Sequence, residues 1–313
     1  MLSRTADSLY WMARYIERAE NMARVADVAY RMDLMRPLEQ DPASLWQPAL
    51  EAAGDPVGFA ERYGAVNMEN AVAYLALDRD NPTSIWRCIR AARENARALR
   101  GSITTEMWEA LNATWLEIAT LTREQLFSGG VREFFDRVKL QSHLFRGVTY
   151  GTMLHDETFL FVRLGTFVER ADDTARLLDT KYHVLLPDPK AVGGAMDYYQ
   201  WGALLRSVSA FRAYHRIYRD VVTPWRVAEL LVLRHDMPRS MHASFDEITQ
   251  VLDKLQGGQG SDARRLAGAM HAQLHFGRMD DIFKTGLHEF LVEFVSQTGE
   301  LGQQIERDFM LRQ

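Results

Sequence analysis

The sequence of 313 residues has a single cysteine, Cys88. One cysteine cannot form an internal disulfide, and multi-cysteine zinc sites need further cysteines at set spacings. This composition is typical of a reducing compartment, so we predict a cytoplasmic protein. Neighbouring arginines could lower the pKa of its thiol, whereas apolar neighbours would raise it, and we expect Cys88 to be a buried structural residue rather than a catalytic thiol.

Long apolar runs are also missing. No stretch approaches the roughly 18 apolar residues of a membrane-spanning helix, and the N-terminal segment carries charges in its first two turns, unlike a secretory signal. We therefore expect no membrane insertion. Neither charge dominates, because 37 Lys and Arg face 42 Asp and Glu for a net charge of −5. This balance argues against nucleic acid as a partner.

The chain has only nine prolines, and between them apolar residues recur at the helical period. Leu9, Met12, Ile16 and Ala19, for example, follow one another by three, four and three positions, which marks one face of a helix. No comparable period of two, typical of strands, occurs. We predict an all-α protein with helices at 5–35, 42–53, 66–77, 83–100, 104–126, 131–149, 157–185, 196–220, 224–234, 239–255, 261–276 and 286–311.

An internal repeat is the most informative pattern. Residues 15–27 (YIERAENMARVAD) align without gaps on residues 167–179 (FVERADDTARLLD). A second pair of segments, 72–84 and 228–240, follows at nearly the same offset. Because the two pairs occur in the same order, we predict one domain over 1–313, an internally duplicated helical bundle. Its halves, about 1–150 and 151–313, would have a pseudo-twofold arrangement.

Each copy of the repeat carries a polar stripe beside small alanines. Exposed charged stripes usually just face water, but this one recurs in both halves. We hypothesise that the two motif helices meet and that Glu17 or Glu169 reaches an arginine of the other half. The candidate binding residues are Glu17, Arg18, Glu20, Arg24 and Asp27 in the first copy and Glu169, Arg170, Asp172, Arg176 and Asp179 in the second.

A basic helix face is the second candidate site, and it includes Arg90, Arg93 and Arg97. Guanidinium groups bind carboxylates and phosphates bidentately, so this face could hold an anionic ligand or dock a partner. The alternative is that the arginines are solvated or pair within the chain. We favour this second interpretation, because most charged faces have no ligand.

His271 and His275 have the one spacing that is typical of metal ligands, since residues four apart on a helix can place two imidazoles on one ion. Two histidines alone seldom define a site, and the Glu-x-x-His pattern of di-iron bundles is missing. We predict no metal and no cofactor, and leave open whether these two histidines bind an ion. Motifs for nucleotide binding or an activated nucleophile are also lacking, so catalytic residues stay unassigned.

The segments LSRTADSLYWMARYIERAENMARVAD, DRDNPTSIWRCIRAARENAR and TFVERADDTARLLDTKYH resemble the bacterial alpha-E family. The resemblance spans essentially the whole chain, and the Glu-Arg pairs that name the family are Glu17-Arg18 and Glu169-Arg170 here. The sequence departs from the family at His155, where an arginine is expected. The resemblance implies an all-helical protein without an established activity. It also implies association with a circularly permuted ATP-grasp protein, transglutaminase-like peptidases and a proteasome-like peptidase.

We therefore predict an accessory protein rather than an independent enzyme: a scaffold, carrier or regulatory subunit of an ATP-grasp amide-bond-forming ligase, with a peptide as candidate ligand. One alternative is an enzyme that acts on a peptide or amino-acid carboxylate, with Glu17 or Glu169 as acid or base. Another is a purely structural helical dimer, so homo-oligomerisation stays open. Whether the motifs line an open pocket or a closed interface discriminates between these functions.

Overall fold

The computed structural model describes residues 3–36, 41, 43–53, 56–185, 195–256 and 261–310, and these residues form helices and connecting turns with no strand. Their all-α class is as predicted. The helices are α1 (Ser3–Leu34), α2 (Ala43–Ala52), α3 (Pro56–Tyr63), α4 (Met68–Ala76), α5 (Ile85–Ala98), α6 (Thr105–Ile118), α7 (Arg123–Ser128), α8 (Val131–Thr152), α9 (Glu157–Leu185), α10 (Ala195–Ser207), α11 (Phe211–Tyr218), α12 (Pro224–Val232), α13 (Met241–Gln256), α14 (Asp262–His275), α15 (Met279–Thr285) and α16 (Leu287–Phe309).

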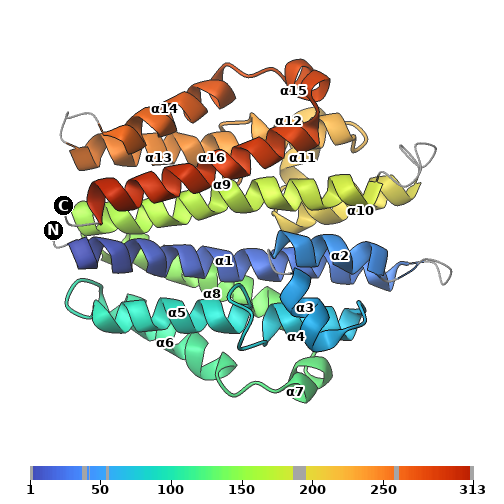
Figure 1. Cartoon of the computed structure of the whole chain (residues 1–313), viewed down its shortest axis with the longest axis horizontal. Helices are drawn as coiled ribbons and strands as arrows, with labels where there is room; N and C mark the ends of the chain where they lie inside the picture. The colour runs from blue at the N-terminus through green and yellow to red at the C-terminus, as the bar shows by residue number, and fades with distance from the viewer. Residues whose placement is uncertain are drawn as a thin grey trace.

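Two long helices, α1 and α9, lie side by side through the middle of the molecule (Figure 1). They run in the same direction, because Gly165 of α9 lies against Tyr10 of α1 and, further along both helices, Glu169 meets Arg18. The approach at Gly165 is close: a Cβ atom there would lie 2.3 Å from the carbonyl oxygen of Tyr10. Glycine is therefore required at this crossing.

Small side chains continue this contact along both helices. Ala19 and Ala23 of α1 and Ala171 and Ala175 of α9 are completely buried. Each alanine stands directly beside the polar stripe of its own helix. The short side chains let the two backbones approach closely enough for the charged side chains of one helix to reach the other.

The other long helices form one group on each side of this central pair (Figure 1). On one side, α1 packs against α5 and α8, and α6 contacts both of these. On the other side, α9 packs against α13 and α16, and α14 contacts both of these. The shorter helices α2 and α10 lie against both α1 and α9. The two groups therefore follow the same order along the chain.

The turns that precede α5 and α13 make the same hydrogen bonds. The hydroxyl of Ser84 donates to the carbonyl six residues earlier at 2.6 Å and accepts from the N–H three residues later at 3.1 Å. Ser240 makes the equivalent two bonds, and the second measures 2.9 Å. The similarity of segments 72–84 and 228–240 thus extends from the sequence to the hydrogen bonds that start each helix.

Several predicted helix bounds need correction. The predicted helix over 104–126 is wrong, because Thr122 and Gln125 form a capping box that starts α7 as a separate helix. The predicted helix over 196–220 is also wrong, since Ser209 has a positive φ of 59° and separates α10 from α11. The short helices α3 and α15 were not predicted, whereas the bounds of α9 are confirmed.

None of the described helices combines the length and the apolar character that crossing a bilayer requires. This finding agrees with the lack of long apolar runs in the sequence.

Candidate functional site

The two Glu-Arg motifs meet between α1 and α9. The hypothesis that Glu17 or Glu169 reaches an arginine of the other motif is confirmed, and both glutamates do so. Arg170 donates to Glu17 through Nε at 2.9 Å and through Nη2 at 3.1 Å. Arg18 donates to Glu169 in the same forked way, with its Nη2 at 3.0 Å. Arg14 adds a further bond to Glu169 at 2.6 Å. Forked pairs of this kind fix both geometry and orientation.

Glu17 and Glu20 share additional arginines. Arg146 of α8 donates from one amino group to Glu17 at 2.7 Å and to Glu20 at 2.5 Å. Arg239, in the turn before α13, lies 3.1 Å from Glu17 and also binds Glu20. Arg24, one turn along α1 from Glu20, donates to it at 2.9 and 2.6 Å. Guanidinium groups from four elements therefore surround these two carboxylates.

These carboxylates are buried and ionised. Glu17, Glu20 and Glu169 each expose at most 1% of their surface. Burial by itself raises the pKa of Glu17, but the surrounding arginines, led by Arg170, outweigh burial and lower this pKa to about 2. The pKa values of Glu20 and Glu169 are lowered by neighbouring arginines against the same effect of burial. Such carboxylates are poorly suited to accept or donate a proton near neutral pH.

Asp173 behaves differently from these glutamates. It lies one turn after Glu169 on α9 and is buried, and its Oδ2 has no hydrogen-bond partner among the described residues. Burial raises the pKa of Asp173 well above its ordinary value, and the charge of Glu169 raises it further. In the first copy of the repeat the equivalent residue is Asn21. The first copy of the repeat thus has an uncharged amide at this position. In the second copy the raised pKa favours the uncharged carboxyl form of Asp173.

Positive charge is in excess in this largely buried network. Within the described part of the chain its arginines outnumber its carboxylates by six to three: Arg14, Arg18, Arg24, Arg146, Arg170 and Arg239 against Glu17, Glu20 and Glu169. Burial lowers the pKa of Arg239 despite its two glutamate partners. Because uncompensated buried charge costs free energy, an anion close to this network would be stabilised.

A cavity of about 130 Å³ lies beside the network, between α8 and α9. Arg146 and Arg170, which both bind Glu17, form part of its wall, and Arg163 contributes a third guanidinium. A carboxylate can accept forked bonds from guanidinium groups, and aromatic rings can pack against the apolar part of the same ligand. The other lining residues are Phe145, Thr149, Tyr150, Phe159, Val162, Thr166 and Phe167.

The remaining residues of the motif stripes lie further along the two helices. Asp27 binds Lys139 of α8 at 2.9 Å, and Arg176 pairs with Asp172 at 2.7 Å within α9. Asp179 lies 2.7 Å from a histidine of α16. None of these stripe residues is among those that line the cavity. They connect α1 and α9 to the outer helices or stabilise their own helix.

The arginine face on α5 makes contacts within the chain. The Arg90 guanidinium lies 5.4 Å from the ring centre of Trp86, and Arg93 donates to Asn112 at 2.9 Å. Arg97 lies 3.2 Å from a glutamate of its own helix. These contacts agree with internal pairing, the favoured interpretation from the sequence. A role of these arginines in anion binding stays a prediction.

Three arginines of the network were not predicted. The position of Arg14 could have been noticed, because it lies one turn before Arg18 on the same face of the helix. No sequence pattern indicates the other two, since Arg146 is 129 residues from Glu17 and Arg239 is 219 residues from Glu20. Only the packing of α8 and of the turn before α13 against α1 brings them to the glutamates.

A family model and several known proteins are similar in sequence to this chain. The family model described as "A predicted alpha-helical domain with a conserved ER motif" matches residues 1–310. Three uncharacterized proteins, one from Mycobacterium bovis and two from strains of Mycobacterium tuberculosis, are each 25% identical over 320 residues. The matches cover 94% of this chain and 35% of each relative, so the chain spans about a third of their length. No solved structure gives a significant match.

Proposed function

Because the chain belongs to the Alpha-E family, we propose that it is a non-catalytic helical partner of an ATP-grasp amide-bond-forming ligase in a bacterial peptide synthesis or modification system. It acts there as a scaffold, carrier or regulatory subunit in the cytoplasm. Transglutaminase-like and proteasome-like peptidases of the same system are further candidate partners. In the mycobacterial relatives the matching region makes up 35% of the length, which fits a helical unit that works beside other protein sequence.

The proposal includes an internal duplication with pseudo-twofold symmetry. Two observations support it: the reciprocal bonds of Arg18 and Arg170, and the common order of helices in the groups around α1 and α9. In this arrangement the Glu-Arg motifs hold the two halves together. The catalytic chemistry would belong to the ligase.

The ligand in this proposal is a peptide that presents a carboxylate to the cavity between α8 and α9. One observation carries this assignment: two of the guanidinium groups that form its wall, those of Arg146 and Arg170, belong to a network with more arginines than carboxylates. Glu17 holds Arg146 and Arg170 in place, and Arg163 lies on the same wall. The carboxylate would supply the negative charge that the buried network lacks.

The same geometry counts against the alternative of an enzyme that uses Glu17 or Glu169 as acid or base. Both carboxylates are buried and bound by arginines. A proton transfer to substrate would require these pairs to open, and the lowered pKa values oppose protonation.

The partnership can be tested with the purified chain and the ATP-grasp protein encoded in the same genome. We expect the two proteins to form a complex and the chain to change the rate of amide-bond formation. Absence of both effects would contradict the proposal. Arg163→Gln is the test variant, because this side chain lines the cavity and pairs with a partly exposed Glu247. Arg132→Gln on the exposed face of α8 is its control.

The ligand class can be tested separately by calorimetry. A short peptide with a free C-terminal carboxylate is compared with the same peptide as its amide. We expect the free carboxylate to bind about tenfold more tightly or better, because hydrogen bonds to a charged group contribute roughly 1.5–3 kcal/mol. The difference should disappear in Arg163→Gln and persist in Arg132→Gln. Equal affinity of the two peptides for the unaltered chain would exclude carboxylate recognition.

A further inference from the structure

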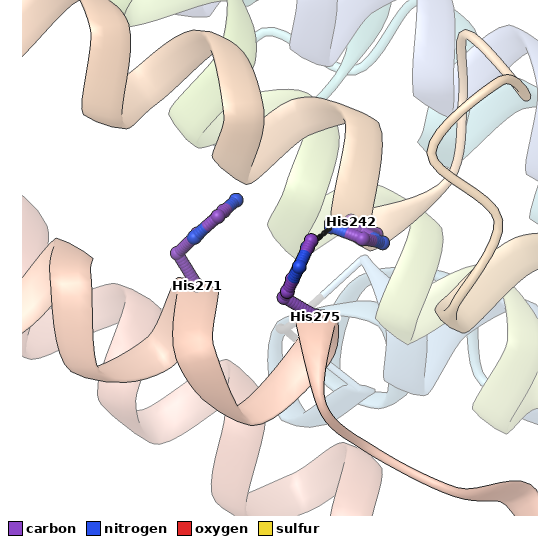
Figure 2. Close-up of side chains that lie close together, drawn as sticks. All are labelled: His242, His271 and His275. Atoms are coloured by element: carbon purple, nitrogen blue, oxygen red, sulfur yellow. Dashed lines mark hydrogen bonds between the residues drawn. The ribbon is translucent and has the colours of Figure 1, made fainter.

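Three histidines outside the motif network come together between α13 and α14. His242 lies in the first turn of α13, and His271 and His275 lie one turn apart on α14. Figure 2 shows the three rings in the space between the two helices. One ring nitrogen from each histidine can be chosen so that all three atoms lie within 4.8 Å of one another. The sequence pattern indicated only the pair on α14, because His242 belongs to another helix.

The spacing of the ring nitrogens matches a coordination site. Nε2 of His242 and Nδ1 of His275 are 3.4 Å apart. With metal–nitrogen distances of about 2.0–2.1 Å, two ligands of a tetrahedral ion are separated by about 3.3 Å. The observed separation lies at the long end for a hydrogen bond, which is how Figure 2 marks this pair. The same separation also suits two nitrogen ligands of one ion.

The tautomer of His242 also suits a metal ligand. Its Nδ1 lies 2.8 Å from the carbonyl oxygen of Leu233. A carbonyl only accepts hydrogen bonds, so Nδ1 carries the proton and Nε2 keeps a free lone pair that faces His275. Histidines that bind metals are commonly oriented in this way, by a bond from the other ring nitrogen to a carbonyl or carboxylate. The side chain of His242 is buried, which holds the ring in this position.

A carboxylate stands next to the group. Oδ1 of Asp246, one turn after His242 on α13, lies 2.7 Å from Nε2 of His271 and 3.7 Å from Nε2 of His242. At 2.7 Å this carboxylate accepts a hydrogen bond from the His271 ring and orients it, as acidic side chains around metal-binding histidines commonly do. Three imidazoles are ligands that Zn²⁺ accepts, with the fourth position open to water, whereas Mg²⁺ and Ca²⁺ prefer sites built from oxygen atoms. The side chains of His271 and Asp246 are about one third exposed or less, at 27% and 32%, so an ion can enter from solvent.

We propose that His242, His271 and His275 bind one Zn²⁺ ion and that Asp246 orients the ring of His271. One ligand comes from α13 and two from α14, so the ion ties these helices together. The site shares none of its ligands with the Glu-Arg network or with the cavity between α8 and α9. It is therefore independent of the proposed function.

The test uses the full chain without a polyhistidine tag, stripped of metal with a chelator. Zn²⁺ is then titrated against a chromophoric chelator to obtain stoichiometry and affinity. His275→Gln is the main variant, because this exposed residue can be changed without disturbing the core. His235→Gln is the matched control, since its exposed ring lies 6.2 Å from that of His242 but is not part of the group.

We expect one Zn²⁺ per chain, affinity at least about tenfold weaker in His275→Gln, and no change in His235→Gln. Thermal unfolding gives a second measurement. Added Zn²⁺ should raise the unfolding midpoint of the unaltered chain and of His235→Gln but not of His275→Gln, and Mg²⁺ should have no effect. Binding should weaken at acidic pH, because the imidazoles must give up their protons. Equal Zn²⁺ affinity in the unaltered chain and His275→Gln, or no stoichiometric binding, would overturn the proposal.

Discussion

Arg18 and Arg170 stand at equivalent positions of the two motif helices, and each binds the glutamate that directly precedes the other. Adjacent residues on a helix point about 100° apart, so the glutamate and the arginine within one motif do not face each other. The glutamate and the arginine of one motif therefore pair with residues outside that motif. The parallel packing of α1 and α9 provides these partners, and the outer arginines complete the coordination of Glu17.

The first prediction concerns the loss of the carboxylate at Glu17. Glu17→Gln leaves Arg170 without its glutamate partner in a buried place and removes one of the two glutamate partners of Arg239, so the free energy of unfolding should fall by about 3–5 kcal/mol. Chemical denaturation measures this change. Glu109→Gln, at an exposed position of α6, should remain within about 0.5 kcal/mol of the unaltered chain. An unchanged unfolding midpoint in Glu17→Gln would show that the pair does not hold the halves together.

The second prediction concerns which of the two motif glutamates contributes more to stability. Arg14 and Arg18, which bind Glu169, expose 14% and 22% of their side chains, whereas Arg170, which binds Glu17, exposes 9%. Arg146 and Arg239 also bind Glu17, but they keep Glu20 as a partner. Water can therefore solvate Arg14 and Arg18 after the loss of Glu169 better than Arg170 after the loss of Glu17. Glu169→Gln should destabilise the chain less than Glu17→Gln under the same conditions. The reverse order would mean that exposure does not govern the cost.

The third prediction concerns pH and Asp173, whose pKa burial raises. The unfolded chain releases this proton near the ordinary pKa of about 3.8, while the folded chain retains it, so the folded state loses relative stability as the pH rises. Asp173→Asn removes this effect. Its stability advantage should grow by about 1.4 kcal/mol per pH unit above pH 4, up to the pKa of Asp173 in the folded state. Denaturation curves at several pH values measure it, and a constant difference would contradict the raised pKa.

The fourth prediction uses two glycines with opposite surroundings. Gly165→Ala places a methyl group against the carbonyl of Tyr10 and should destabilise the chain by about 1–3 kcal/mol. Gly147, in α8, faces open space, so Gly147→Ala should stabilise its helix by roughly 0.5–1 kcal/mol. Thermal unfolding of both variants provides the comparison. Similar effects of the two substitutions would argue against close contact between α1 and α9.

The fifth prediction concerns Cys88, which is completely buried in α5 as expected. Burial raises the pKa of its thiol to about 12. The thiolate is the reactive form, so a thiol reagent at pH 8 should label the unfolded chain rapidly and the native chain hardly at all. Mass spectrometry counts the labels. Fast labelling of the native chain would place Cys88 near the surface.

Sequence periodicity and repetition predicted much of the fold because the central helices carry both signals. Helix α9 has the predicted bounds, and the repeated motif correctly indicated contact between Glu17 and an arginine of the other half. The breaks at Thr122 and Ser209 were missed, since the apolar period continues across each break while local capping or a positive φ ends the helix. Local backbone chemistry outweighed periodicity at these two places.

The candidate sites were less predictable than the helices. The cavity depends on Arg146, Arg163 and Arg170 meeting on facing sides of α8 and α9, which no short sequence pattern encodes. The histidine group likewise depends on the distance between α13 and α14. His242 becomes a neighbour of His275 only when these helices pack together.

Under the proposed internal duplication, the reciprocal contact between the motif helices corresponds to an interface in a twofold dimer, where one surface meets its own copy. Here both copies belong to one polypeptide, joined through the short turn at 153–156. Two separate subunits would lose such an interface on dilution, because association depends on their concentration. Within one chain the local concentration of each half at the other is fixed by the connection, so the arginine–glutamate bonds hold at any dilution.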